Sequence, residues 1–154
     1  MNLPRFFWRI VQFGPRCAYA LGLGPLIGRI VLLLTTVGRK SGQPRVTPLV
    51  YDERDGIILV ASARGDRADW LRNIQANPKV KVRIGSREFA SQATLVTDPE
   101  QIADYLERQF QRNPKMFGAI LRSEGLPPSP SRDDLLALAT KRPMVALTPD
   151  GIDV

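Results

Sequence analysis

Residues 79–96 read KVKVRIGSREFASQATLV, and the first six alternate basic and apolar side chains with a period of two. This period is typical of a strand with one buried face, and Gly85-Ser86 supplies a turn after it. Residues 79–84 and 87–96 are therefore predicted to form two neighbouring strands. The buried face of such a pair requires further strands or helices to cover it.

Three more strands are predicted on the N-terminal side of this pair. Residues 31–37 and 45–51 are rich in apolar and β-branched side chains and flank a glycine-containing turn at 38–42, which indicates a hairpin. A turn at 52–56 leads into the continuous apolar run at 57–61, which is typical of a strand buried on both faces. These three strands are expected to meander antiparallel.

Helices are predicted around these strands. Residues 66–76 carry one apolar side, with Asp66 as a capping residue and Asn77-Pro78 as the end of the helix. Three further helices and a last strand are predicted at 98–111, from 114, at 132–140 and at 144–148, with a Pro- and Ser-containing loop at 124–131. The sequence thus predicts an α+β fold that is mainly β: a barrel of about six mostly antiparallel strands with helices packed outside.

Length and composition fit one globular domain over residues 1–154, with 44% hydrophobic and 24% charged residues. Residues 1–30 interleave aromatic and arginine side chains and are interpreted as an amphipathic helical segment. A helix packed on the barrel and a helix lying on a membrane surface both stay open. Because glycines, Pro25 and Arg29 interrupt the apolar part, no transmembrane helix is predicted. No signal peptide is predicted either, because the apolar part comes late and lacks a clear small-residue cleavage site.

The composition excludes several kinds of chemistry. The chain has no histidine and a single cysteine, Cys17, which rules out a histidine-based catalytic triad and an intramolecular disulfide and fits a cytoplasmic location. The acidic residues show no metal-binding spacing, so no metal is predicted. An enzyme of this composition would depend on a bound cofactor. The net charge of +7 favours an anionic partner: nucleic acid, acidic lipid, or a phosphorylated or polycarboxylate small molecule.

Residues 35–49 read TTVGRKSGQPRVTPL and place Arg39, Lys40 and Arg45 in the predicted hairpin. Its glycines let the backbone approach a ligand, and its cations and hydroxyls suit a phosphate group. The order of residues is not that of a P-loop. Taken alone, the motif is more typical of a basic turn exposed to solvent.

Further motifs follow in a fixed order: Leu33–Leu49, Tyr51, Asp55-Gly56, Ala61-Ser62, Trp70, Asn73, Ala76-Asn77-Pro78 and Val80. This pattern, over roughly residues 30–97, resembles the deazaflavin-dependent nitroreductase family. The resemblance implies a split β-barrel of the flavin-reductase-like kind that binds reduced coenzyme F420. It also implies an oxidoreductase that transfers hydride to an electron-poor small-molecule acceptor such as a quinone, a nitro compound or an activated alkene.

The resemblance also implies a site. The hairpin cations would hold the phosphate and acidic tail of the cofactor, the two following strands would line its ring, and the helix would close the groove. Arg64 stands where the family often has glycine and is an alternative phosphate ligand. The predicted cofactor-binding residues are Arg39, Lys40, Arg45, Thr47, Pro48, Leu49, Ala61, Ser62, Arg64, Trp70 and Asn73. No catalytic residue is predicted, because hydride transfer needs mainly alignment of donor and acceptor.

Alternatives stay open for the function and the partners. FMN is an alternative cofactor, and a non-catalytic split barrel that binds a cofactor or a lipid is an alternative function. Nucleic acid is not predicted as a partner, because no RNA-recognition signature is present. The oligomeric state is open, with a dimer as one option. Peripheral attachment at the inner membrane face depends on the N-terminal segment.

Overall fold

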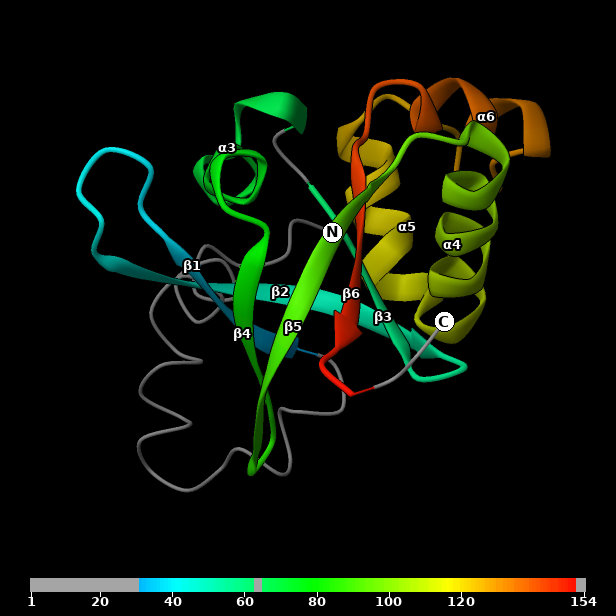
Figure 1. Ribbon diagram of the computed structural model, residues 1–154. Coiled ribbons are helices and arrows are strands. Elements are labelled where there is room, and N and C mark those ends of the chain that lie inside the picture. The colour runs from blue at the N-terminus through cyan, green and yellow to red at the C-terminus, as the bar shows by residue number, and fades with distance from the viewer. Residues whose placement is uncertain (1–30, 63–64, 152–154) are drawn as a thin grey trace.

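The computed structural model describes residues 31–62 and 65–151. Within this part of the chain, six strands form one closed antiparallel barrel in the order β1-β2-β3-β6-β5-β4 (Figure 1). The strands are β1 Val31–Val37, β2 Pro44–Arg54, β3 Ile57–Ala61, β4 Lys79–Ile84, β5 Arg87–Val96 and β6 Met144–Pro149. The mainly-β α+β class and the antiparallel meander of β1 to β3 are confirmed.

The β2 strand is longer than predicted. It extends to Arg54, because Glu53 and Arg54 pair with the first two residues of β3, and the turn is reduced to Asp55-Gly56. Both turn residues have positive φ, 53° and 78°. This is the backbone conformation of a tight hairpin whose twist matches that of the flanking strands.

Register decides which side chains of β2 share a face with the barrel interior. Leu34 and Thr36 on β1 are buried, and they lie opposite Thr47 and Arg45 on β2. Because directly opposed residues of an antiparallel pair point to the same face, Thr47 and Arg45 belong to the inward row. Pro48 belongs to the opposite row. The inward row therefore ends in a cation at the edge of the barrel.

The helices cover one end and one side of the barrel (Figure 1). Helix α3, Asp69–Ala76, contributes Trp70, Leu71 and Ile74 to the same core cluster as the inward residues of β1 and β4. A second core lies between the outer face of β3 and β6 and three packed helices, α4 Pro99–Arg112, α5 Pro114–Ser123 and α6 Arg132–Ala139. Asp98 caps α4 by accepting a hydrogen bond from the Glu100 N–H at 3.0 Å, as its position in the sequence predicts.

The predicted helix from Asp66 is wrong at its start. A separate 3-10 turn spans Gly65–Arg67, and α3 begins at Asp69 after Ala68, with no side-chain cap. Ala68 has extended backbone angles and is buried in the core cluster. Packing of Ala68 thus separates the turn from the helix, and Asp66 does not act as a cap.

Candidate functional site

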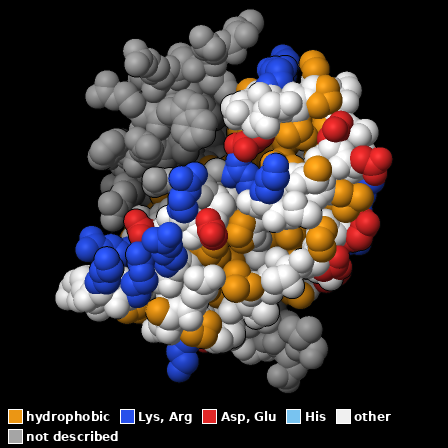
Figure 2. Space-filling view, turned by 90° about the horizontal axis from the view of Figure 1, so that it is seen from above, with side chains coloured by type: hydrophobic (Ala, Val, Ile, Leu, Met, Phe, Trp, Pro, Cys, Tyr) orange, Lys and Arg blue, Asp and Glu red, His pale blue; other side chains and the backbone are white. Residues whose placement is uncertain are grey.

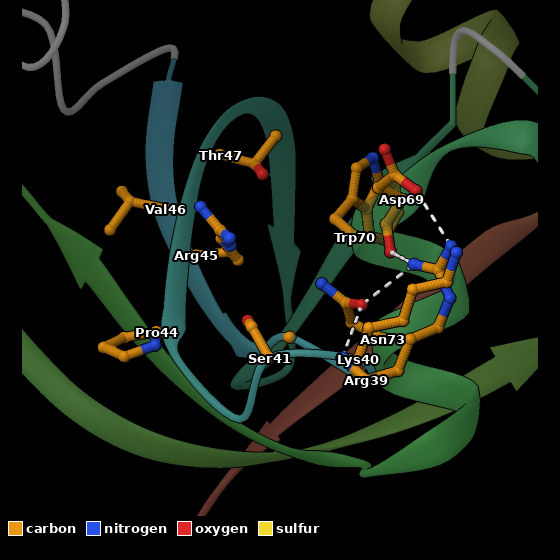
Figure 3. Close-up of a pocket in the computed structure, with 11 residues that line it drawn as sticks. Arg39, Lys40, Ser41, Pro44, Arg45, Val46, Thr47, Asp69, Trp70 and Asn73 are labelled. Atoms are coloured by element: carbon orange, nitrogen blue, oxygen red, sulfur yellow. Dashed lines mark hydrogen bonds and ion pairs between the residues drawn. The ribbon is translucent and has the colours of Figure 1, made fainter.

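A cavity of about 550 Å³ lies between the β1–β2 hairpin and helix α3 (Figure 3). Two segments far apart in the sequence line it, the hairpin and helix α3. The lining residues are Gly38, Arg39, Lys40, Ser41, Pro44, Arg45, Val46, Thr47, Asp69, Trp70 and Asn73. We call this feature the hairpin cavity. Its volume lies within the range of small-molecule sites, about 300 to 1,000 Å³.

The turn of the hairpin is held by its own backbone. The Gly38 N–H donates to the carbonyl of Gln43, and the Gly42 N–H donates to the carbonyl of Gly38, both at 2.8 Å. A Cβ atom at Gly38 would lie 2.6 Å from Ser41 Oγ, so a side chain there would displace the serine. Gly42 has φ +68°, which strains other residues. The two glycines are thus required by the turn.

Arg39 joins this turn to α3. Its backbone N–H and its Nη1 each donate to Asn73 Oδ1 at 3.1 Å, and its Nη2 pairs with Asp69 Oδ1 at 3.1 Å. Asn73 in turn donates from Nδ2 to Thr36 Oγ1 at 3.1 Å, inside the barrel wall. Asn73 therefore connects the hairpin, the helix and β1 through one buried amide. We call Thr36, Arg39, Asp69 and Asn73 the Asn73 network.

Lys40 and Arg45 line the same cavity but, unlike Arg39, have no charged partner in the part of the chain that the structure describes. Among the described residues, neither side chain forms an ion pair or a hydrogen bond with a protein group. Arg45 lies on β2 beside Thr47, across the cavity from Arg39 and α3 (Figure 3). Figure 2 shows Lys and Arg side chains gathered toward the hairpin side of the molecule. Two uncompensated cations thus face a concave surface, which is an arrangement suited to an anionic ligand.

The structure brings together six of the predicted site residues and separates four others. Arg39, Lys40, Arg45, Thr47, Trp70 and Asn73 all line the hairpin cavity. Pro48, Leu49, Ala61 and Ser62 do not belong to its lining. Arg64 lies outside the described residues. The predicted tail-binding and groove-closing groups therefore meet in one place, and most of the residues predicted to line the ring lie elsewhere.

Each of the four separated residues has a defined environment. Leu49 packs against the barrel core, and Ala61 packs against the helix-covered core. Pro48 is on the other face of β2 from Thr47. The Ser62 hydroxyl donates to the carbonyl of Gly65 at 2.6 Å. The ring-lining role of these four residues stays a prediction.

Five lining residues are not among the predicted site residues: Gly38, Ser41, Pro44, Val46 and Asp69. The first four belong to the predicted hairpin, so Asp69 is the one that the sequence motif does not contain. An acidic residue in the first turn of a helix is ordinarily explained by the helix dipole, so its sequence position carries no further signal. Its contact with Arg39 joins residues 30 positions apart. A long-range contact of this kind needs the closed barrel, which brings the hairpin beside α3.

Two other sequence predictions concern membranes and metals. None of the helices in residues 31–62 and 65–151 combines the length and the apolar character needed to cross a membrane. The same residues contain no group of three or more histidine, cysteine or acidic side chains placed to hold a metal ion. The segment at 1–30 and its two interpretations lie outside the described residues.

Comparison of the sequence with known proteins gives a consistent result. The model of the family described as F420H(2)-dependent quinone reductase matches residues 18–119, a range that holds the whole hairpin cavity. The F420H(2)-dependent quinone reductase Rv1261c of Mycobacterium tuberculosis is 40% identical over 74 residues, which are 45% of this chain and 50% of that protein. The chain thus spans about half the length of this relative.

Solved structures with a similar fold include an F420-H2 dependent reductase, FDR-A, and HutZ, the heme storage protein from Vibrio cholerae. FDR-A has a TM-score of 0.53 at 23% identity, over 77% of this chain and 94% of that one. HutZ has a TM-score of 0.55 at 17% identity, over 99% of this chain and 93% of that one. At these identities the likeness establishes the shared barrel fold.

Proposed function

Because the chain belongs to the F420H(2)-dependent quinone reductase family, we propose that it binds reduced F420 at the hairpin cavity and reduces a quinone. The observation that carries this proposal is the pair of unpaired cations, Lys40 and Arg45, facing the cavity. Both side chains are exposed and have no carboxylate partner among the described residues, so their charges are available to a ligand. An anionic ligand would form charge-assisted hydrogen bonds with them.

The residues present fit the cofactor's acidic tail. Lysine and arginine form charge-assisted hydrogen bonds with phosphate and carboxylate oxygens, and arginine can do so with two parallel donors. Thr47 adds a hydroxyl on the same inward row as Arg45. The backbone hydrogen bonds of Gly38 and Gly42 fix the hairpin, so the backbone positions that carry these side chains are set before a ligand arrives.

The bound cofactor would supply the redox chemistry, giving one hydride that, with one proton from solvent, converts a quinone into a hydroquinone while the cofactor is oxidised. The chain's own contribution is to bind and orient. Trp70 is buried in the barrel core and also lines the hairpin cavity, so it contributes apolar surface to the cavity wall. Among the described residues, the groups that line the cavity would act chiefly by positioning the cofactor and the acceptor.

A fluorescence titration tests the cofactor. F420, FMN and FAD are added to the full chain, and binding of F420 with a Kd well below about 100 µM, equivalent to roughly 5.5 kcal/mol, is expected. Failure of all three to bind at that level would remove the proposal. Binding of FMN in preference to F420 would replace it with the flavin-dependent alternative.

A turnover assay tests the reaction. Reduced F420 is mixed with a soluble quinone, a nitroaromatic compound and an activated alkene, and oxidation of the cofactor is followed by its absorbance. We expect the quinone to be reduced in a protein-dependent way. Binding of F420 without turnover of any acceptor would favour the non-catalytic cofactor-binding alternative.

A further inference from the structure

The geometry points to Asp69 as a residue that determines charge specificity: we propose that its carboxylate neutralises Arg39 and thereby limits how strongly the hairpin cavity holds an anionic tail. The inference deepens the proposed function and rests on it. It divides the three predicted cations into two kinds. Lys40 and Arg45 are free to meet the ligand, whereas Arg39 is a positioning residue whose charge is already matched.

The contacts of Arg39 separate its charge partner from its anchors. Asp69 Oδ1 is its only carboxylate partner among the described residues, at 3.1 Å from Nη2. The Asp69 carbonyl accepts from Nη1 at 3.5 Å, and Asn73 Oδ1 accepts from both Nη1 and the backbone N–H at 3.1 Å. Removal of the Asp69 charge therefore leaves three hydrogen bonds to hold Arg39 where it is.

The Asp69 carboxylate is also placed to act on a ligand directly. Its side chain is 78% exposed, yet Asp69 belongs to the lining of the cavity. A carboxylate at this position repels an anionic tail, while water around it keeps the repulsion modest. Within residues 31–62 and 65–151, Asp69 is the charge that lines the cavity with a sign opposite to that of Arg39, Lys40 and Arg45.

Solvent exposure argues that Asp69 is not needed for the fold. An exposed ion pair contributes little to stability, and the core contacts of α3 come from Trp70, Leu71 and Ile74. Its position in the first turn of α3 adds a modest favourable interaction with the helix dipole. Neutralising Asp69 therefore changes the charge of the cavity more than it changes the protein.

The test compares two ligands that share a ring and differ in charge: oxidised F420 and a tail-free 5-deazaflavin. Asp69→Asn is titrated with both by fluorescence, at about 50 mM and about 500 mM salt. We expect Asp69→Asn to bind F420 about two- to fivefold more tightly than wild type at low salt, a gain that shrinks at high salt. The tail-free ligand should bind both proteins equally.

Two matched variants separate charge from structure. Asp69→Glu keeps the negative charge and should bind F420 as wild type does. Asp66→Asn removes one negative charge from the neighbouring 3-10 turn, outside the lining of the cavity, and should give less than half of the gain. Thermal melting of each protein reports whether the fold is unchanged.

Each other outcome overturns the inference in a recognisable way. Weaker F420 binding by Asp69→Asn would make Asp69 a support of the site rather than a limit on it. Equal tightening for both ligands, or an equal gain from Asp66→Asn, would show an effect unrelated to the tail at this position. If wild type binds no F420, the proposed function fails together with this inference. If wild type binds F420 in a salt-dependent way and Asp69→Asn gains nothing, this inference alone fails.

Discussion

The two ends of strand β2 carry charge in opposite arrangements. At its start, Arg45 faces the hairpin cavity without a carboxylate partner among the described residues. Near its far end, Asp52 is 5% exposed and accepts from Arg108 Nε at 3.2 Å and from Arg112 Nη1. A buried carboxylate held by two cations is a structural feature, whereas an unpaired cation at a cavity is available to a ligand. The pairing of charges, rather than their number, distinguishes the two ends.

The largest effect is expected from Asp52→Ala. The change leaves Arg108 and Arg112 without their acceptor and opens the link between the barrel and α4. Loss of one partner of a buried pair costs about 3 to 5 kcal/mol, and partial exposure of both arginines brings the expectation to about 2 to 3 kcal/mol. Thermal melting should show a decrease of roughly 5 to 10 °C.

The control for this change is Glu53→Ala, the next residue of the strand. Glu53 is exposed and lies 3.9 Å from Arg87, so its loss should shift stability by less than about 0.5 kcal/mol. Folded Asp52→Ala protein should still bind F420 as wild type does. If Asp52→Ala were as stable as wild type, the structural role of the pairs between Asp52 and the two arginines would be contradicted.

Asn73→Ala should give the next largest loss of stability. It removes the amide that joins the hairpin, α3 and β1, and it leaves the buried Thr36 hydroxyl without its donor. An unsatisfied buried polar group costs about 1 to 3 kcal/mol. Urea unfolding measures the loss, with Gln75→Ala, exposed on the same helix, as the control expected to change little. Stabilities that match in the two variants would show that the Asn73 network does not hold the hairpin.

Lys40→Ala and Arg45→Ala should change binding and spare the fold. Loss of one charge-assisted hydrogen bond, about 1.5 kcal/mol, corresponds to roughly a tenfold weaker Kd for F420. The loss should shrink as salt is raised. Lys79→Ala, which removes an exposed cation outside the cavity, is the control. Wild-type affinity in both cavity variants would end the assignment of the tail to this end of β2.

How much of the fold can be predicted from the sequence depends on how far apart in the sequence the interacting residues lie. The alternation at residues 79–84 and the cap at Asp98 are local signals, and the sequence predicts both correctly. Closure of the barrel was expected in general terms, but the pairing of β3 with β6 and of β1 with β4 joins distant segments. The extra length of β2 follows from its pairing with β3, which a turn assigned at Asp52 does not anticipate.

The candidate site shows the same division. Lys40 and Arg45 are found from a short basic motif, because a hairpin places its cations together. The role of Arg39 was not separable from theirs, since its partners lie on α3. Ser62 is predicted to line the ring, which stays a prediction, and its hydroxyl donates to the carbonyl of Gly65, a contact that the sequence does not reveal. A short sequence motif identifies the cations of a candidate site, but only the tertiary structure shows which of them already have a partner within the protein.

The buried charges around Asp52 also lead to a prediction about the pH dependence of stability. Burial, and then the nearby Asp52 carboxylate, raises the pKa of the Tyr105 phenol above its ordinary value, so the phenol stays protonated in the folded state. A group whose pKa is higher in the folded state contributes its whole stabilisation below its unfolded pKa, which is about 10 for tyrosine. This contribution is lost as the pH rises toward the folded pKa. Between pH 10 and 11, Tyr105 should thus cost the wild type about 1 kcal/mol, a cost that Tyr105→Phe does not bear. Urea unfolding of both proteins at pH 8 and pH 11 measures this difference. Parallel losses in the two proteins would place the alkaline sensitivity elsewhere. A larger loss in wild type would show that the buried site beside Asp52 disfavours the ionised phenol, whereas the open site at Arg45 accommodates an added negative charge.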